Sequence, residues 1–273
     1  MKILLRVAAL GVLALALMPY ARAQSSGAVP DILGLKLGMT PDQVSSVVKS
    51  DLKNPSRSPF IGHLALKSYR SPKILFGESY KDGENAQFGE LNKEFFFINY
   101  SFPENPRVIY ISRSVAFDQA SAPTVQSYVN AAIAKYGKPV AIDHPGSPSL
   151  RITWNWGGNI HETKAYNRAN GIYADCTSWV QNNNGPFLWL RQINTTFTPA
   201  EVAKIYPQCA ITMTLEIQTI ANNPFLVASV AMQVGDFNAL GASYVTMLKT
   251  AQAGAAAAEK KADQHAVTNA PRL

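Results

Sequence analysis

The two cysteines are the residues whose type and spacing point most directly to chemistry. Cys176 and Cys209 are the only cysteines of the chain, and a bond between them would close a loop of about 33 residues. An even cysteine count in a chain sent to an oxidising compartment favours a disulfide. In the chain-entropy model such a cross-link contributes about 3–4 kcal/mol. We expect this disulfide, with a reactive or metal-binding thiol pair as the alternative.

A window rich in tryptophan and asparagine is the second candidate site. It holds all four tryptophans of the chain, Trp154, Trp156, Trp179 and Trp189, together with amides such as Asn182. Aromatic planes beside amides offer stacking area and directional hydrogen bonds, which suit a sugar or a peptide. The candidate ligand-binding residues are therefore Trp179, Trp154, Trp156 and Asn182. Alternatively, Trp154 and Trp156 share one strand face and pack on a sheet, which leaves Trp179 as the best exposed candidate.

The remaining polar residues match no catalytic or metal-binding motif. His161-Glu162 begins like a zinc-protease helix, but Ala165 stands where the second histidine is required. Asp143 and His144 are neighbours whose side chains point apart in an extended segment. No serine lies in a Gly-x-Ser-x-Gly elbow. We therefore expect no catalytic residue, no metal and no cofactor, while a site assembled from distant Asp, Glu and His residues stays open.

The first 23 residues have the pattern of a secretory signal peptide. A basic start precedes an apolar run at 7–18, and Ala21-Arg22-Ala23 offers small residues at the two positions that a signal peptidase reads. The run is too short to span a membrane, and Gln24 occupies the position that a lipidated cysteine would need. We expect cleavage after Ala23 and a soluble periplasmic or secreted protein with no membrane span.

The charge balance argues against nucleic acid as a partner. The chain has 25 Lys and Arg residues against 18 Asp and Glu. Three basic residues, Lys2, Arg6 and Arg22, belong to the leader, so 22 remain and the excess falls from +7 to +4. Because the remaining cations are scattered and form no basic run, we expect no nucleic-acid binding.

Hydrophobic periodicity predicts helices and strands along most of the chain. Thr40-Pro41-Asp42-Gln43 is a helix start with a capping box, and the helical spacing from Val125 to Tyr136 ends at Gly137. The predicted strands are 94–102 and 107–117 as an antiparallel pair, then 150–156, 187–193, 211–217 and 225–234. Gly, Pro and charged residues interrupt 55–92, which predicts short strands and loops there. Asp236 is expected to cap a last helix that runs to Ala251.

Helices and antiparallel strands come in blocks, which favours an α+β fold with helices packed on antiparallel sheets. The expected organisation is a signal peptide at 1–23, a first helix-plus-sheet half at 31–118, a second half at 122–251 that carries the disulfide, and a flexible Ala/Lys-rich tail at 254–273. Thr198-Pro199 repeats the helix start at Thr40-Pro41. Two independent caps or an internal duplication would each explain that repeat.

One short segment resembles a known family. Residues 34–44, with Gly38-Met39-Thr40 followed by Gln43-Val44, are similar to the helix start of the BamE/SmpA outer-membrane assembly lipoproteins and of their β-lactamase-inhibitor-like fold. The resemblance implies a helix packed on an antiparallel sheet and a role in protein–protein contact. It implies no catalytic residue. The chain departs from the lipoproteins in lacking a lipid-acceptor cysteine.

The sequence as a whole predicts an exported envelope protein that acts as an interaction or binding module. The expected partner is an envelope protein. The alternative is a carbohydrate- or peptidoglycan-binding protein, or a hydrolase, that uses the Trp/Asn window at 154–189. An inhibitor or immunity-type protein follows only from the fold analogy. The sequence does not predict the oligomeric state.

Overall fold

A computed structural model describes residues 30–66, 69–83, 86, 87, 89–102, 104–146, 149–157 and 210–268. This part contains three helices, α1 (Pro41–Asp51), α2 (Val125–Tyr136) and α6 (Phe237–Thr268). The strands of its large sheet are β3 (Pro55–Gly62), β6 (Ile74–Asp82), β7 (Glu94–Tyr100), β8 (Val108–Ala116), β9 (Ala141–Gly146), β10 (Ser149–Trp156), β11 (Ile211–Ile220) and β12 (Asn223–Asp236). Two small hairpins join β1 (Asp31–Ile32) to β2 (Leu35–Lys36), and β4 (Ala65–Leu66) to β5 (Tyr69–Arg70).

One continuous antiparallel sheet forms the body of the described part. Its eight strands have the order β3-β6-β7-β8-β12-β11-β10-β9. The order of a helix followed by four sheet strands therefore occurs twice, first as α1 with β3, β6, β7 and β8, and then as α2 with β9 to β12. We call these the first and second halves. They meet at the β8–β12 pair, where Arg113 is aligned with Met232.

The first helix begins where its sequence predicts. Thr40 Oγ1 accepts a hydrogen bond from the Gln43 backbone at 3.3 Å, and Gln43 Oε1 accepts one from the Thr40 backbone at 2.9 Å. This reciprocal capping box satisfies donors that a helix start would otherwise leave unpaired. Val44 and Val48 are the buried residues of α1. The predicted helix start at Thr40-Pro41 is thus confirmed.

The second helix is bounded by matching signals. Thr124 is its N-cap and accepts a hydrogen bond from the Ser127 backbone at 3.1 Å. Gly137 ends the helix with a φ of 81°, a conformation that costs glycine little. The two N-caps that open the repeated order are therefore Thr40 and Thr124. The Thr198-Pro199 segment, on which the duplication hypothesis rests, lies outside the described residues.

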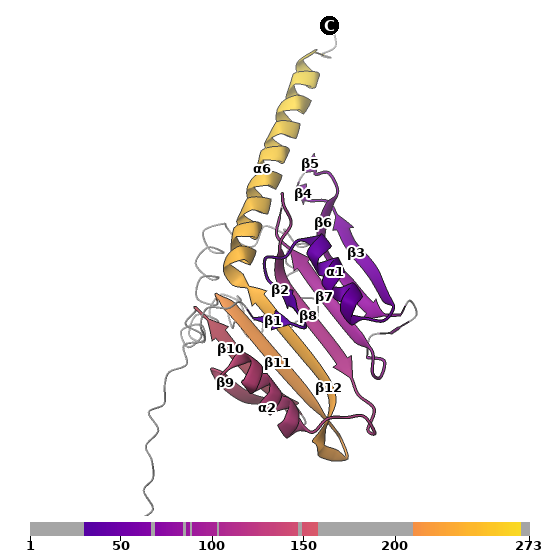
Figure 1. The fold of residues 1–273 in the computed structure, drawn as a ribbon. Coiled ribbons are helices and arrows are strands. Elements are labelled where there is room, and N and C mark those ends of the chain that lie inside the picture. Colours follow the sequence, from indigo (N-terminus) through magenta and orange to yellow (C-terminus); the bar gives the residue numbers. More distant parts are fainter. Residues whose placement is uncertain are drawn as a thin grey trace, which may run out of the picture.

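Helices α1 and α2 share one face of the sheet. A single buried cluster joins Val44 and Val48 of α1, Ala132 of α2, and sheet residues that include Ile111 and Val234. In Figure 1, α1 lies over the strands of the first half and α2 over those of the second. Because successive side chains of a strand point to opposite faces, every second sheet residue faces these helices. The other residues form a second face, and we call its part over the central strands β8, β12 and β11 the polar face.

The predicted α+β class is wrong, because the described part of the chain is mainly β. The difference arises in residues 55–82, where short strands and loops were expected but β3 and β6 are long, paired strands. Pro59 is tolerated because β3 is an edge strand of the sheet. Gly77 is required in β6, since an added Cβ would lie 2.3 Å from the Ile98 carbonyl oxygen. Proline and glycine usually interrupt strands, but Pro59 and Gly77 each occupy a specific position within β3 or β6.

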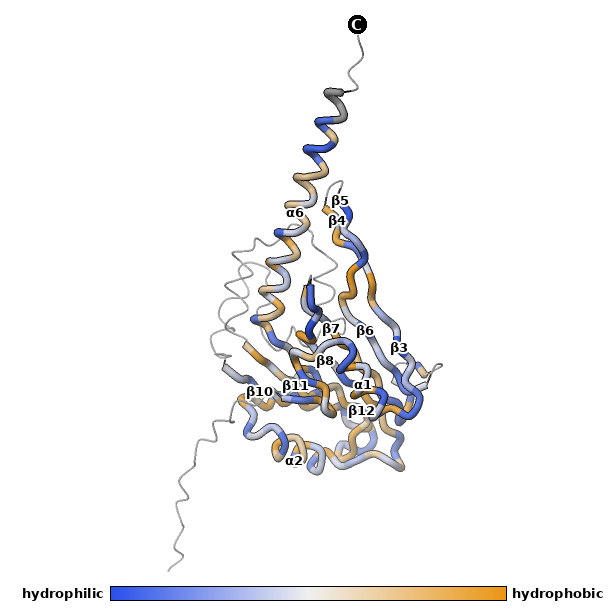
Figure 2. The backbone as a smooth tube through the Cα atoms, turned by 45° about the horizontal axis from the view of Figure 1, so that its top comes forward, coloured by the Kyte–Doolittle hydropathy of each residue, from blue (hydrophilic) through white to orange (hydrophobic). Residues whose placement is uncertain are grey.

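The last helix is longer than its pattern predicts. Asp236 Oδ1 accepts a hydrogen bond from the Ala239 backbone at 2.9 Å, as expected for the cap, but α6 continues through the expected tail to Thr268. Its first half packs in a second core with Phe76, Phe102 and Ile109. At Gly254 an added Cβ would lie 2.3 Å from the Tyr69 ring, so this glycine is a packing position. The last turns of α6 extend beyond the sheet (Figure 1), and Figure 2 shows hydrophilic residues near its end. Glu259, Lys260 and Lys261 are exposed there.

Other predictions have different outcomes. The antiparallel pair 94–102 and 107–117 is confirmed as β7 and β8, and the alternating segments are confirmed as β10, β11 and β12. Within the described residues, no helix is long and apolar enough to cross a membrane. The signal peptide, Cys176 and Cys209, and the predicted strand at 187–193 lie outside the described residues.

Candidate functional site

The tryptophans of the second half support the fold. Trp154 is 2% exposed, its indole Nε1 donates to the Gly137 carbonyl at 2.9 Å, and its ring meets Tyr136 edge-on. Trp156 is half-buried and packs against the same core. Trp154 therefore holds the end of α2 against β10. This agrees with the alternative prediction, in which Trp154 packs on the sheet. The other candidates of the window, Trp179, Trp189 and Asn182, lie outside the described residues.

The described acidic and histidine residues do not assemble a metal site. Asp143 and His144 are consecutive residues of β9, so their side chains point to opposite faces, as predicted. In the part of the chain that the structure describes, no group of three or more His, Cys, Asp and Glu residues could hold a metal ion.

The polar face of the central strands carries small and hydrophilic side chains. In β8, Ser112 and Ser114 alternate with the buried Ile111 and Val115. The other central strands follow the same rule, with Ala231 and Gln233 in β12 and Thr214 and Glu216 in β11. This alternation places hydroxyl, amide and carboxylate groups together on the side opposite α1 and α2.

The strand register aligns these residues across both halves. Phe95 pairs with Ser114, Ser114 with Ala231, and Ala231 with Glu216. Phe95 and Glu216 are therefore three strand spacings apart, or about 14 Å at about 4.8 Å per spacing. The small side chains of Ser114 and Ala231 lie between them. A row with small residues at its centre and larger ones at its ends forms a trough.

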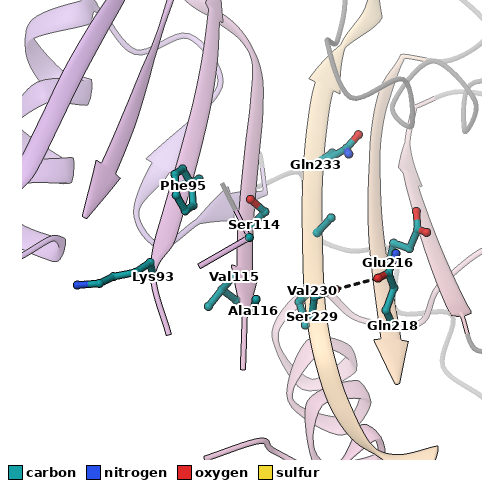
Figure 3. Close-up of a pocket in the computed structure, with 12 residues that line it drawn as sticks. Lys93, Phe95, Ser114, Val115, Ala116, Glu216, Gln218, Ser229, Val230 and Gln233 are labelled. Carbon is teal, nitrogen blue, oxygen red and sulfur yellow. Dashed lines mark hydrogen bonds between the residues drawn. The ribbon is translucent and has the colours of Figure 1, made fainter. Parts of the chain in front are cut away.

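A pocket of about 390 Å³ occupies this trough. Figure 3 shows it between the two halves, with Lys93, Phe95 and Ser114 on one side and Glu216, Gln218 and Gln233 on the other. Its volume is within the range of small-ligand sites, roughly 300–1,000 Å³. The pocket lies where the halves meet, and junctions of this kind are frequent ligand sites.

Several side chains of the pocket can both donate and accept hydrogen bonds. Ser229 Oγ donates to Gln218 Oε1 at 3.2 Å (Figure 3), and the Tyr110 hydroxyl donates to Gln233 Oε1 at 3.2 Å. Amide and hydroxyl groups carry both donors and acceptors. The pocket therefore contains side chains that can offer either function to a ligand.

Two ion pairs flank the pocket. The Glu216 carboxylate lies 3.9 Å from Arg151, and the Lys93 ammonium lies 4.0 Å from Asp82. The side chain of Glu216 is 29% exposed. Within the described residues, Arg151 Nε is buried without a hydrogen-bond partner, so its guanidinium group retains a donor beside the pocket. The loose Arg151–Glu216 pair leaves the carboxylate able to accept further hydrogen bonds.

Glu78 is a second acidic residue, and its environment is the opposite of that of Glu216. The side chain of Glu78 in β6 is fully buried. Its Oε1 accepts hydrogen bonds from the hydroxyls of Tyr80 and Tyr100, and its Oε2 accepts one from Arg57 Nε at 2.5 Å. Burial, followed by the contact with Glu78, raises the pKa of both tyrosines far above the ordinary value. Glu78 thus forms one hydrogen-bonded group with Tyr80, Tyr100 and Arg57, which we call the Glu78 cluster.

A smaller cavity of about 250 Å³ lies between α2 and the β1–β2 hairpin. Arg113 is at its base, where its Nε donates to Glu94 Oε2 at 3.1 Å. Burial lowers the pKa of Arg113, but the hydrogen bond to Glu94, the charge of Glu94 and the contact with Tyr128 together raise it overall. Because Glu94 already binds this cation, and most other lining residues are apolar, the cavity offers few polar groups to a ligand.

Comparison with known proteins adds no relative. No protein-family model, no curated protein and no solved structure matches the chain. The resemblance of residues 34–44 to the BamE/SmpA lipoproteins therefore stays a prediction, and the site has to be interpreted from its own geometry.

Sequence reasoning missed the central pocket. Most of its residues come from four strands, and only the register brings Phe95, Ser114 and Glu216 into one row. A signal was present in β8, where Ser112 and Ser114 interrupt an apolar strand at a spacing of two. That spacing predicts one shared face, but not which strand pairs with it.

Proposed function

We propose that this chain is an exported binding protein that captures its ligand in the central pocket of the polar face. The observation that carries the proposal is the pocket itself, which combines polar side chains from both halves at the β8–β12 junction. The sheet beneath it is fully paired there. A rigid, paired sheet positions binding side chains more accurately than a loop does.

The composition of the pocket favours binding over catalysis. General acid–base chemistry needs two titratable groups within reach of the same bond. In the pocket, Lys93 and Glu216 stand on opposite sides of the trough and each is paired outward, with Asp82 and Arg151. The described lining residues include no histidine or cysteine, so none of these groups is present to activate Ser114 or Ser229. The pocket offers hydrogen bonds, which suits recognition.

Export rests on the leader at residues 1–23 and is part of the proposal. A periplasmic or secreted location would bring the pocket into contact with envelope material. Cell fractionation of the tagged full chain tests this part directly. Recovery of a shortened chain in the periplasm or medium supports export, and retention of the full chain in the cytoplasm overturns it.

A protein partner is the second candidate, and one specific observation favours it. The edge strand β9 exposes Ile142 by 53%, and the residue just before the strand, Val140, is 41% exposed. An edge strand with exposed apolar side chains can pair with a strand of another protein. This surface is distinct from the central pocket, so one experiment can separate the two.

Site-specific photo-crosslinking in intact cells tests the site. The full chain would carry p-benzoylphenylalanine in place of Lys93 at the rim of the pocket, in place of Ile142 at the edge, or in place of Gln126 on the exposed side of α2. Position 93 leaves the small residues at the centre of the trough unchanged, so the pocket stays open. The proposal predicts a mass-shifted adduct from position 93 and none from position 126. An adduct from position 142 alone would favour the protein partner and overturn the pocket.

A further inference from the structure

We propose that the ligand of the central pocket is an uncharged, polyhydroxylated molecule, namely the sugar ring of a neutral oligosaccharide. This inference rests on the proposed binding function and names the chemistry of its ligand. It is carried by the side chains of the pocket and by the paired strands beneath them, and it does not depend on the tryptophans of the 154–189 window.

The pocket is a poor site for an anion. Anion sites rely on unpaired backbone N–H groups or on unpaired cations. In the pocket, the N–H groups of β8, β12 and β11 belong to a continuous ladder. Lys93 lies beside Asp82. Arg151 keeps an unpaired Nε donor, but it is not among the described lining residues, and Glu216 stands between it and the trough. The Glu216 carboxylate would repel a phosphate or a carboxylate placed beside it.

An extended peptide and an apolar ligand fit the pocket poorly as well. A peptide binds a sheet by pairing with a free edge, but β8 and β12 are the two central strands and are paired on both sides. An apolar ligand would bury Ser114, Ser229, Gln218 and Glu216 without replacing their hydrogen bonds to water. Each such loss costs about 1–3 kcal/mol by mutational measure.

Hydroxyl groups match what the pocket offers. Each hydroxyl is both a donor and an acceptor, as are the side chains of Ser114, Ser229 and Gln218 that it would meet. The Glu216 carboxylate can accept from two neighbouring hydroxyls, as they occur on a sugar ring, and hydrogen bonds to a charged group are the stronger ones. Phe95 on the opposite side of the trough offers ring carbon atoms to the C–H face of the sugar.

The first step of the test is direct binding to the mature chain, from Gln24 onward. The probes are a printed array of neutral and acidic oligosaccharides, followed by saturation-transfer NMR and calorimetry with the selected neutral sugar. We expect binding to at least one neutral oligosaccharide and weaker binding to its uronic-acid counterpart. No neutral sugar bound, or preference for the acidic counterpart, overturns the inference.

Variants then place the sugar in the pocket. Ala231→Trp fills the trough and should abolish binding, while Glu216→Gln should weaken it about tenfold, because a hydrogen bond to a charged group is lost. Gln126→Ala on α2 is the matched surface control and should bind like the parent chain. If Ala231→Trp fails to fold by circular dichroism, Ser114→Leu blocks the same trough. Unchanged sugar binding by a folded blocking variant overturns the inference.

The outcomes also separate the inference from the proposed function. A protein or an anionic molecule captured at position 93 in cells would leave the binding function intact and overturn the sugar assignment. The absence of any adduct at position 93, together with the absence of sugar binding, would overturn both.

Discussion

Glu78 and Glu216 are both strand residues of the same sheet, yet their environments are opposite. Glu78 is fully buried, and its two oxygens are bound by Tyr80, Tyr100 and Arg57. Glu216 is partly exposed and lies 3.9 Å from Arg151. A carboxylate whose acceptors are filled by the fold contributes to stability. A carboxylate with acceptor capacity left over, in a pocket, is available to a ligand.

Removal of the two carboxylates should have very different effects on stability. Glu78→Ala leaves two buried hydroxyls and a guanidinium without their acceptor, and we expect it to cost about 3 kcal/mol. Arg57 is 45% exposed, so most of this cost comes from the tyrosines. Glu216→Ala should cost about 1 kcal/mol, because the pair is loose and Glu216 is partly exposed, although Arg151, 15% exposed, loses its partner. Urea unfolding of both variants measures the difference, and equal costs would contradict the comparison.

Gly77, the neighbour of Glu78 in β6, tests how tightly β6 and β7 are packed around the Glu78 cluster. In Gly77→Ala the new Cβ would meet the Ile98 carbonyl oxygen of β7 at 2.3 Å. Backbone has to shift to relieve this contact, at an expected cost of about 2 kcal/mol. Ser79→Ala, two residues along the same strand, is the control and should cost within about 0.5 kcal/mol. Thermal unfolding compares them, and a neutral Gly77→Ala would show that β6 and β7 are loosely packed.

The tyrosines of the Glu78 cluster make a pH prediction. Burial, followed by the contact with Glu78, raises the pKa of Tyr80 and Tyr100 in the folded chain, whereas an unfolded tyrosine titrates near about 10. Their contribution is therefore fully present below about pH 10 and is lost as the pH rises above it. Tyr100→Phe should cost about 1 kcal/mol at neutral pH. The variant should also lose less stability than the parent chain between about pH 9 and about pH 11, on either side of the unfolded tyrosine pKa. An unchanged alkaline slope, measured by urea unfolding at each pH, would contradict this.

The smallest effect is expected for an exposed ion pair. Lys135 Nζ lies 2.9 Å from Asp31 Oδ1 and joins α2 to the β1–β2 hairpin. Burial alone would raise the pKa of Asp31, but the hydrogen bond from Lys135 and other contacts lower it overall. The pair therefore contributes above the unfolded value of about 3.9 and less as the pH falls below it. Because both groups are partly exposed, Lys135→Ala should cost at most about 0.5 kcal/mol at neutral pH. A cost above about 2 kcal/mol, measured by urea unfolding, would show that this exposed pair stabilises the fold as strongly as the buried Glu78 cluster and would contradict the prediction.

Local signals in the sequence predicted local structure well. Thr40 and Gln43 form the expected capping box, Gly137 ends α2, and Asp236 caps α6. These features depend on residues within one turn of each other, so their pattern is contained in a short segment.

Long-range features were not predictable in the same way. Pro59 and Gly77 look like interruptions until the edge position of β3 and the close approach of β7 are known. Gly254 resembles the end of a helix until Tyr69 is placed against it. The central pocket depends on the pairing of β8 with β12, strands more than a hundred positions apart in the chain. Pairing between such distant strands is set by tertiary packing, to which periodicity is insensitive.

Chemical-shift mapping of residues 24–273 with the neutral oligosaccharide selected on the array shows directly where the sugar binds. If the central pocket is the binding site, amide signals of Ser114, Ala231 and Glu216 move on titration, while those of Glu78 and Tyr100 in the Glu78 cluster stay in place. Shifts confined to the β9 edge at Ile142, or no shifts at all, would contradict the claim that the central pocket is the binding site.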